Sequence, residues 1–229
     1  MNFFRRTRFG LFAAALLAAC TAQRTPPSTF VMGQAGGTAR AKADSLRYPY
    51  TQADIDFMSG MIHHHAQAIY ISRWAPSHGA SASVQRLTSR IINAQTDEIA
   101  LMQMWLRDRN RDPMTVDSTG TVSMKAMDHS EHGGHSMASM ATMPGMLTDA
   151  QLAQLDAARG PEFDRLFLIF MMQHHRGAVS MVKTLFGAQG AGQDETIFKF
   201  AADVEVDQST EIRRMLTMLL EMGEVPPPQ

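Results

Sequence analysis

Adjacent histidines occur twice in this chain, in two stretches whose sequences resemble each other. The histidines of the first stretch, 57–69, are His63, His64 and His65, and those of the second, 167–179, are His174 and His175. An offset of 110 residues places His64 on His174 and His65 on His175. Imidazole nitrogens bind copper, zinc, iron and nickel. In each stretch a methionine, Met61 or Met171, stands one helical turn earlier and adds a thioether as a candidate ligand.

Two glutamates extend this repeat. At 100° per residue, His65 and His175 fall near the middle of apolar helical arcs, and His64 and His174 fall at their edges. In the helices that follow, Glu98 and Glu211 lie inside the apolar stripes at an offset of 113 residues. Gln95 and Gln208 lie along the edges of the same stripes. A buried carboxylate is costly unless it is paired, hydrogen-bonded or bound to a cation.

Three interpretations of these residues compete. Glu98 and Glu211 accept hydrogen bonds from His65 and His175 without any metal, or the group binds a transition metal. A ferritin-type di-iron oxidase is the third, but its Glu-x-x-His motif is missing from both histidine-bearing segments. The predicted bundle ligands are His64, His65, His174, His175, Glu98, Glu211, Met61 and Met171.

A second set of soft ligands lies between the repeats. Residues 124–146 contain six methionines and three histidines, mostly spaced by three residues, and the glycines and proline among them oppose a continuous helix. Thioethers select Cu(I), and imidazole suits Cu(II). The alternative is a solvated linker of biased composition that binds nothing. The predicted linker ligands are His129, His132, His135, Met137, Met140 and Met143.

The elements that position these residues are predicted to be helices. Periodicity and capping signals predict two long antiparallel hairpins, over about 51–109 and 148–223, joined by a linker over 110–147. Long helices are expected over about 52–74, 82–109, 162–186 and 194–222, with a short one over 148–158. Since neither hairpin can bury its apolar stripe alone, we expect one all-α antiparallel four-helix bundle over 49–225.

The amino terminus predicts export. Arg5, Arg6 and Arg8 precede a short apolar run, and Leu17–Cys20 resembles a lipoprotein cleavage box, so residues 1–19 are predicted to be a signal peptide. Cys20 would be lipidated and anchor the chain to a membrane of the cell envelope, with 20–48 as a flexible tether. The alternative is soluble secretion, with Cys20 as a bystander. The net charge of −1 gives no reason to expect a nucleic-acid partner.

Several segments resemble one known family. They are Asp56-Phe57-Met58, Met61 to Ala68, Glu162-Phe163-Asp164, Met171 to Ala178, and the Gln-x-x-Glu-Ile segments that begin at Gln95 and Gln208. They resemble the domain-of-unknown-function family numbered 305 over roughly residues 50–225. This resemblance implies a ferritin-like four-helix bundle in bacterial, often extracytoplasmic, proteins, some of them linked to copper binding and copper tolerance. His63 departs from the family pattern, because relatives often carry proline there.

The sequence therefore predicts an extracytoplasmic protein that binds Cu(I) or Cu(II) for sequestration, delivery or tolerance, with a possible copper-transfer partner protein. A metal-dependent redox enzyme in the same bundle, or a metal-free structural or partner-binding bundle, is the alternative. The chain has no phosphate loop, dinucleotide fingerprint or Gly-x-Ser-x-Gly elbow, so nothing in it makes a positive case for an enzyme.

Overall fold

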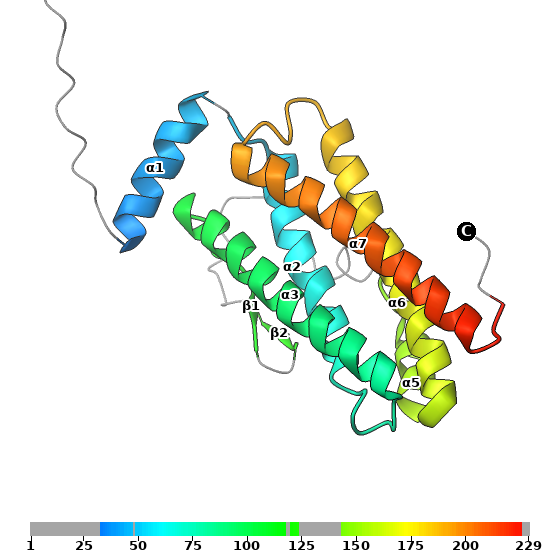
Figure 1. Ribbon diagram of the computed structural model, residues 1–229. Helices are drawn as coiled ribbons and strands as arrows, with labels where there is room; N and C mark the ends of the chain where they lie inside the picture. Colours follow the sequence, from blue (N-terminus) through cyan, green and yellow to red (C-terminus); the bar gives the residue numbers. More distant parts are fainter. Residues whose placement is uncertain (1–32, 48, 118–119, 124–142, 226–229) are drawn as a thin grey trace, which may run out of the picture. The chain divides into compact units, whose positions relative to one another are not determined.

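The computed structural model describes residues 33–47, 49–117, 120–123 and 143–225. All of them belong to one of the two compact units into which the chain divides, Met32–Gln229. Its elements, shown in Figure 1, are α1 (Gly33–Arg47), α2 (Gln52–Ser72), α3 (Ala82–Asp108), β1 (Thr115–Val116), β2 (Val122–Ser123), α5 (Asp149–Ala157), α6 (Gly160–Gly187) and α7 (Glu195–Glu221).

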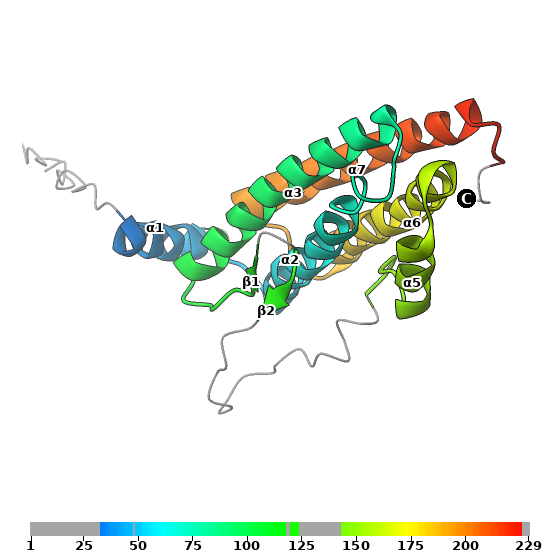
Figure 2. The same cartoon turned by 90° about the horizontal axis from the view of Figure 1, so that it is seen from below.

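The long helices form the predicted bundle. Helix α2 packs against α3 and helix α6 against α7, and α2 also packs against α6. In Figure 2, α2 and α6 form one layer of the bundle and α3 and α7 form the other. The all-α fold is confirmed, and the ends of the long helices lie within two residues of those that the sequence predicted. Within the described part of the chain, no helix has both the length and the apolar character that crossing a membrane requires.

Side-chain caps fix where the helices begin. Thr51 caps α2 in a reciprocal arrangement with Asp54, and Thr148 caps α5 in the same way with Gln151. Both capping boxes satisfy backbone N–H groups that have no partner within their own helix. The predicted starts of these two helices are therefore explained by local chemistry.

Two buried aspartates tie each hairpin to the loop of the other. Asp54 accepts a hydrogen bond from the Gly192 N–H at 2.7 Å, and Asp164 accepts one from the Ser81 N–H at 3.1 Å. Asp54 and Asp164 are separated by the 110-residue offset of the repeat. The start of α2 is thus held beside the end of α6, and the start of α6 beside the end of α2, so the two helices run antiparallel.

The core consists of two apolar clusters separated along the bundle by a polar layer. One cluster contains Met61, Ile99, Val182 and Val204, and the other contains Ile71, Leu87, Phe167 and Met215. Near the middle of each long helix, polar residues face the interior between the two clusters, and they are the ones that the repeat singles out. The layer comprises His64, His65, Gln95, Glu98, His174, His175, Gln208 and Glu211.

The amino-terminal side of the bundle differs from the prediction. The sequence predicted a flexible tether over 20–48, but residues 33–47 form helix α1, which packs against α3. Four alanines favour this helix, and Gln34 donates a hydrogen bond to Asp108 at 3.1 Å. Gly37 lets α1 approach, because a Cβ there would lie 2.3 Å from a carboxylate oxygen of Asp108. In the predicted linker, β1 and β2 form a small antiparallel pair.

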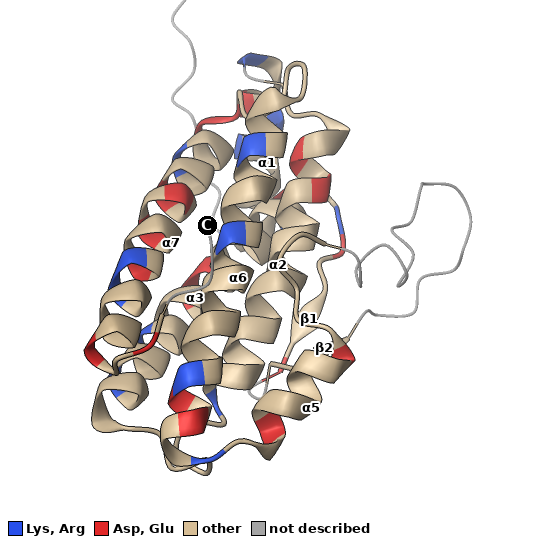
Figure 3. Cartoon of the chain, turned by 90° about the vertical axis from the view of Figure 1, so that its right-hand side faces the viewer, with Lys and Arg blue, Asp and Glu red and all other residues tan. Residues whose placement is uncertain are grey.

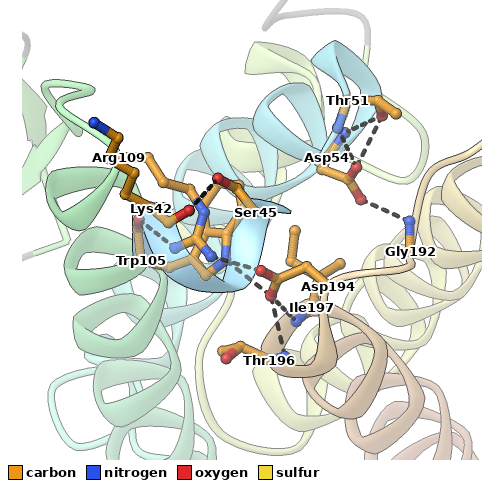
Figure 4. Close-up of polar contacts among 10 residues, drawn as sticks. All are labelled: Lys42, Ser45, Thr51, Asp54, Trp105, Arg109, Gly192, Asp194, Thr196 and Ile197. Atoms are coloured by element: carbon orange, nitrogen blue, oxygen red, sulfur yellow. Dashed lines mark hydrogen bonds and ion pairs between the residues drawn. The ribbon is translucent and has the colours of Figure 1, made fainter. Parts of the chain in front are cut away.

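Apart from the buried aspartates, most charged residues lie on the outside of the helices. Figure 3 shows lysine and arginine interspersed with aspartate and glutamate along α6 and α7. One ion pair is buried instead: Asp194, which caps α7, pairs with Arg109 at the end of α3 (Figure 4).

Candidate metal centre

Each hairpin contributes one imidazole–carboxylate pair to the polar layer. His65 Nε2 on α2 lies 2.7 Å from a Glu98 oxygen on α3, and His175 Nε2 on α6 lies 2.7 Å from a Glu211 oxygen on α7. Only the His175–Glu211 contact has hydrogen-bond geometry. Both histidine side chains are fully buried, and the glutamates are 19% and 14% exposed. The carboxylates therefore reach the interior from its edge.

The other two histidines meet where α2 and α6 pack together. The ring centroids of His64 and His174 are 3.8 Å apart with an interplanar angle of 41°. Both side chains are completely buried. Because His64 and His174 are related by the repeat, the contact brings together equivalent residues of the two hairpins.

Ring nitrogens in this layer lack hydrogen-bond partners. His64 Nε2 is 3.0 Å from the Pro144 carbonyl oxygen, but its Nδ1 has no partner. His65 and His175 also have unpartnered Nδ1 atoms, and His174 has no partner at either nitrogen. Nearby, both amide atoms of Gln95 and the Oε1 atom of Gln208 are buried without a partner. Such groups are costly to bury, so this cluster indicates a site for a polar or cationic ligand.

Burial keeps the central pair neutral. Burial, followed by the charge of His65, lowers the pKa of His64 to about 3. Burial also lowers the pKa of His174 well below its ordinary value, and the neighbouring His64 and His175 act in the same direction. Their lone pairs therefore remain unprotonated and able to bind a metal well below neutral pH.

The hydrogen bonds fit metal-binding histidines. A metal-binding imidazole usually donates its second N–H to a carboxylate or to a backbone carbonyl, which fixes the ring and leaves the first nitrogen for the metal. His175 has this pattern with Glu211, and His64 has it with Pro144. Within the described ranges, no group of three histidine, cysteine or acidic side chains is arranged to hold a metal ion. The two imidazoles that come closest are those of His64 and His174, whose rings are in contact, and imidazole is a ligand that suits copper.

Carboxylates make the surroundings favourable to a cation. Partial burial raises the pKa of Asp207 on α7, and the charges of Glu98, Asp203 and Glu211 raise it further. These glutamates from α3 and α7 are therefore close enough to affect the same carboxyl group. Their negative charge faces the histidine layer from the second layer of the bundle.

A short strap covers the histidine pair. Residues 143–147 cross α2 and α6. The Leu147 N–H donates a hydrogen bond to the side-chain oxygen of Gln67 at 2.8 Å, and the side-chain NH₂ of Gln67 donates one to the Leu147 carbonyl oxygen at 3.1 Å. Gly177 on α6 is essential for this approach, because a Cβ there would lie 2.0 Å from the Pro144 oxygen. In Figure 2, the β1–β2 pair and α5 lie on the same outer side of the α2/α6 layer.

The structure places the predicted ligands in three groups. The four histidines and two glutamates come together in the polar layer. Met61 and Met171 are fully buried, but they lie in different apolar clusters. Met143 lies on the strap, whereas His129, His132, His135, Met137, Met140 and Cys20 lie outside the described residues. The strap and the two glutamines with unpartnered buried atoms, Gln95 and Gln208, were not among the predicted site residues. Gln95 and Gln208 occupy equivalent positions of the repeat, and this equivalence is the feature of the sequence that could have identified them.

We expect acid to destabilise the metal-free protein through His64 and His174. Unfolded histidines titrate near pH 6.5, and the pKa of folded His64 is about 3, so between these values the unfolded state binds a proton that folded His64 does not. The lowered pKa of His174 acts in the same direction. The free energy of unfolding therefore falls as the pH decreases through this window and is unaffected by the pair above it. Urea unfolding at pH 7 and pH 4.5 should show that a His64→Gln, His174→Gln variant loses less stability than the wild type by about 2 kcal/mol or more. Equal losses would contradict this expectation.

Known structures share this fold. A DUF305 protein from Streptomyces coelicolor is 26% identical, with a TM-score of 0.60 over 77% of this chain and 98% of its own. CopM in its Cu(I)-bound form is 25% identical, with a TM-score of 0.52 over 74% of this chain and 96% of CopM. The Cu(II)-bound form of CopM is also 25% identical, with a TM-score of 0.53 over 74% of this chain and 97% of CopM.

At the sequence level, a search of curated proteins found no match. The model of the family described as Domain of unknown function (DUF305) matches residues 54–219. That range includes nearly all of both hairpins and every residue of the polar layer. The chain is therefore a member of the DUF305 family.

Proposed function

We propose that this protein binds copper outside the cytoplasm, with its central site at the His64–His174 pair. The observation that carries the proposal is His174, a fully buried imidazole with no hydrogen-bond partner at either nitrogen. A coordinated cation would satisfy one nitrogen and leave the other to a water or a backbone group. In this proposal Glu98 and Glu211 orient His65 and His175 and supply negative charge.

Copper is the favoured metal for two reasons. Neutral imidazoles suit copper, and CopM, which shares this fold, has been crystallised with Cu(I) and with Cu(II). The methionines and histidines of 124–146 add ligands of the same chemical class. Export is supported by the signal-like amino terminus and by the Streptomyces coelicolor relative, which is described as secreted. Lipid anchoring at Cys20 and a role in sequestration or delivery are parts of the same proposal.

Copper titration of a linker variant tests the bundle site. In this variant His129, His132 and His135 become Asn, and the six methionines of 124–146 become Leu, so that only the bundle provides candidate ligands. We expect it to retain one tightly bound copper ion per chain, measured by equilibrium dialysis. Adding His64→Gln and His174→Gln should lower the affinity at least 100-fold. A linker variant that binds no copper, while its circular dichroism is unchanged, would refute the bundle site.

A further inference from the structure

Two thioethers from distant parts of the chain meet over one glycine of α2. A Cβ on Gly60 would lie 3.2 Å from the sulfur of Met143, on the strap, and 3.4 Å from the methyl carbon of Met181, on α6. Both methionines are only partly buried, at the border of an apolar cluster. They are therefore reachable from solvent, whereas the imidazoles of the polar layer are fully buried.

Gly60 has no backbone reason to be glycine. It lies in the interior of α2 and does not have a positive φ, so alanine would stabilise the helix by about 1 kcal/mol. At Gly177, by contrast, the space for a Cβ is filled by the backbone of Pro144 and Gly145. At Gly60, the space that a Cβ would take is bordered by the ends of two methionine side chains. The glycine thus makes room for the thioethers.

The thioether pair lies next to the histidine pair. Gly60 is four residues before His64 and therefore on the same face of α2. Met181 is seven residues, or two helical turns, after His174 on α6. Met143 directly precedes Pro144, whose carbonyl oxygen is 3.0 Å from His64 Nε2. The thioethers therefore lie one to two helical turns from the imidazoles along the α2/α6 seam.

We infer that Met143 and Met181 form a capture site for a soft monovalent cation, Cu(I) or Ag(I), which then passes to His64 and His174. Thioethers select such ions, and their partial exposure lets the ion bind before it reaches the buried layer. The transfer exchanges metal–sulfur bonds for metal–nitrogen bonds, so the charge of the ion does not change. This inference rests on the proposed copper-binding function and adds the route of entry.

Methyl NMR with Ag(I) as a redox-stable probe tests the site. The mature chain, labelled with ¹³C at the methionine methyl groups and with ¹⁵N in histidine, is titrated with silver nitrate. We expect the Met143 and Met181 methyl signals to shift together, no later than the His64 and His174 ring signals. Met104, on α3 and 54% exposed, is the control whose methyl signal should not move with them. Met143→Leu with Met181→Leu should slow the loading of the histidine pair with added Ag(I) about tenfold and leave its equilibrium affinity unchanged, whereas Met104→Leu should change neither.

The variant Gly60→Ala tests the thioether site independently of the methionine substitutions. The added Cβ should displace the Met143 sulfur by a few tenths of an ångström and so reduce the joint shift of the two methyl signals. Ring shifts without methyl shifts would overturn the capture site and leave the histidine centre standing. Methyl shifts without ring shifts would support the thioether site but refute the hand-over and the histidine centre. The absence of both would overturn both proposals.

Discussion

Replacing His174 with leucine is expected to stabilise the metal-free protein by about 1–2 kcal/mol and to remove its stabilisation by copper. Leucine has a similar size and no polar atoms, whereas the buried imidazole leaves both ring nitrogens without a partner. An unsatisfied buried polar group costs about 1–3 kcal/mol, and an apolar group of similar shape avoids that cost. Urea unfolding of the metal-free protein and thermal melts with and without one equivalent of copper would measure the two effects.

His78 offers a matched control, because it is also buried but has partners at both nitrogens. Its Nδ1 is 2.9 Å from the Trp74 carbonyl oxygen, and its Nε2 is 3.1 Å from Asp156. His78→Leu should therefore destabilise the protein by about 1–3 kcal/mol without changing the copper-induced shift. If His174→Leu destabilised the protein as much as His78→Leu, His174 would be a structural residue with satisfied nitrogens, and the case for a ligand would fail.

Replacing Asp194 with alanine is expected to cost about 3–5 kcal/mol of stability, because it leaves the buried charge of Arg109 unpaired. Asp194 is 2% exposed and accepts hydrogen bonds from Arg109, from the Trp105 indole N–H, and from two backbone N–H groups at the start of α7 (Figure 4). Arg109 also lies over the Trp105 ring, 3.9 Å from its centroid. One carboxylate thus joins the end of α3 to the start of α7.

The exposed pair of Glu162 and Arg165 on α6 is the control for this prediction. It has two hydrogen bonds, at 2.6 and 2.9 Å, but exposed ion pairs contribute little because water and salt screen them. Glu162→Ala should leave the urea midpoint almost unchanged, whereas Asp194→Ala should lower it strongly. Similar midpoints for the two variants would show that Arg109 finds another partner or water when Asp194 is absent.

The sequence predicted the helices and the contents of the polar layer for physical reasons that are local. Apolar residues recur at helical spacing, and capping residues such as Thr51 and Thr148 mark the starts of helices. The placement of Glu98 and Glu211 inside apolar stripes predicted that they face the interior, and each contacts the histidine with which the metal-free interpretation paired it. That pairing also suits a histidine that binds a metal at its other nitrogen, so both interpretations remain compatible with it.

The contact between His64 and His174 could not be predicted from the sequence. Helical periodicity placed both residues at the edge of an apolar arc, but the rotation of α2 against α6 decides which edge is buried. That rotation depends on Asp54 and Asp164, which reach loops of the opposite hairpin. Long-range hydrogen bonds of this kind leave no periodic signal.

The strap was also not predictable, because it depends on glycine at two places far apart in the sequence. Gly145 and Gly177 allow backbone contact that any side chain would block. In the sequence, Pro144 and Gly145 indicated only that a helix does not continue through them. Likewise, α1 was missed because its glycines and alanines resemble a linker, although Gly37 and Gln34 give it contacts with Asp108.

Anomalous diffraction from crystals of the copper-loaded protein, recorded at the copper edge, tests the central claim most directly. We expect an anomalous peak within bonding distance of ring nitrogens of His64 and His174, with His65 and His175 still held by Glu98 and Glu211. If copper is present in the crystal but no peak lies at these imidazoles, and their rings keep the tilted contact of the metal-free bundle, the histidine layer is not the copper site.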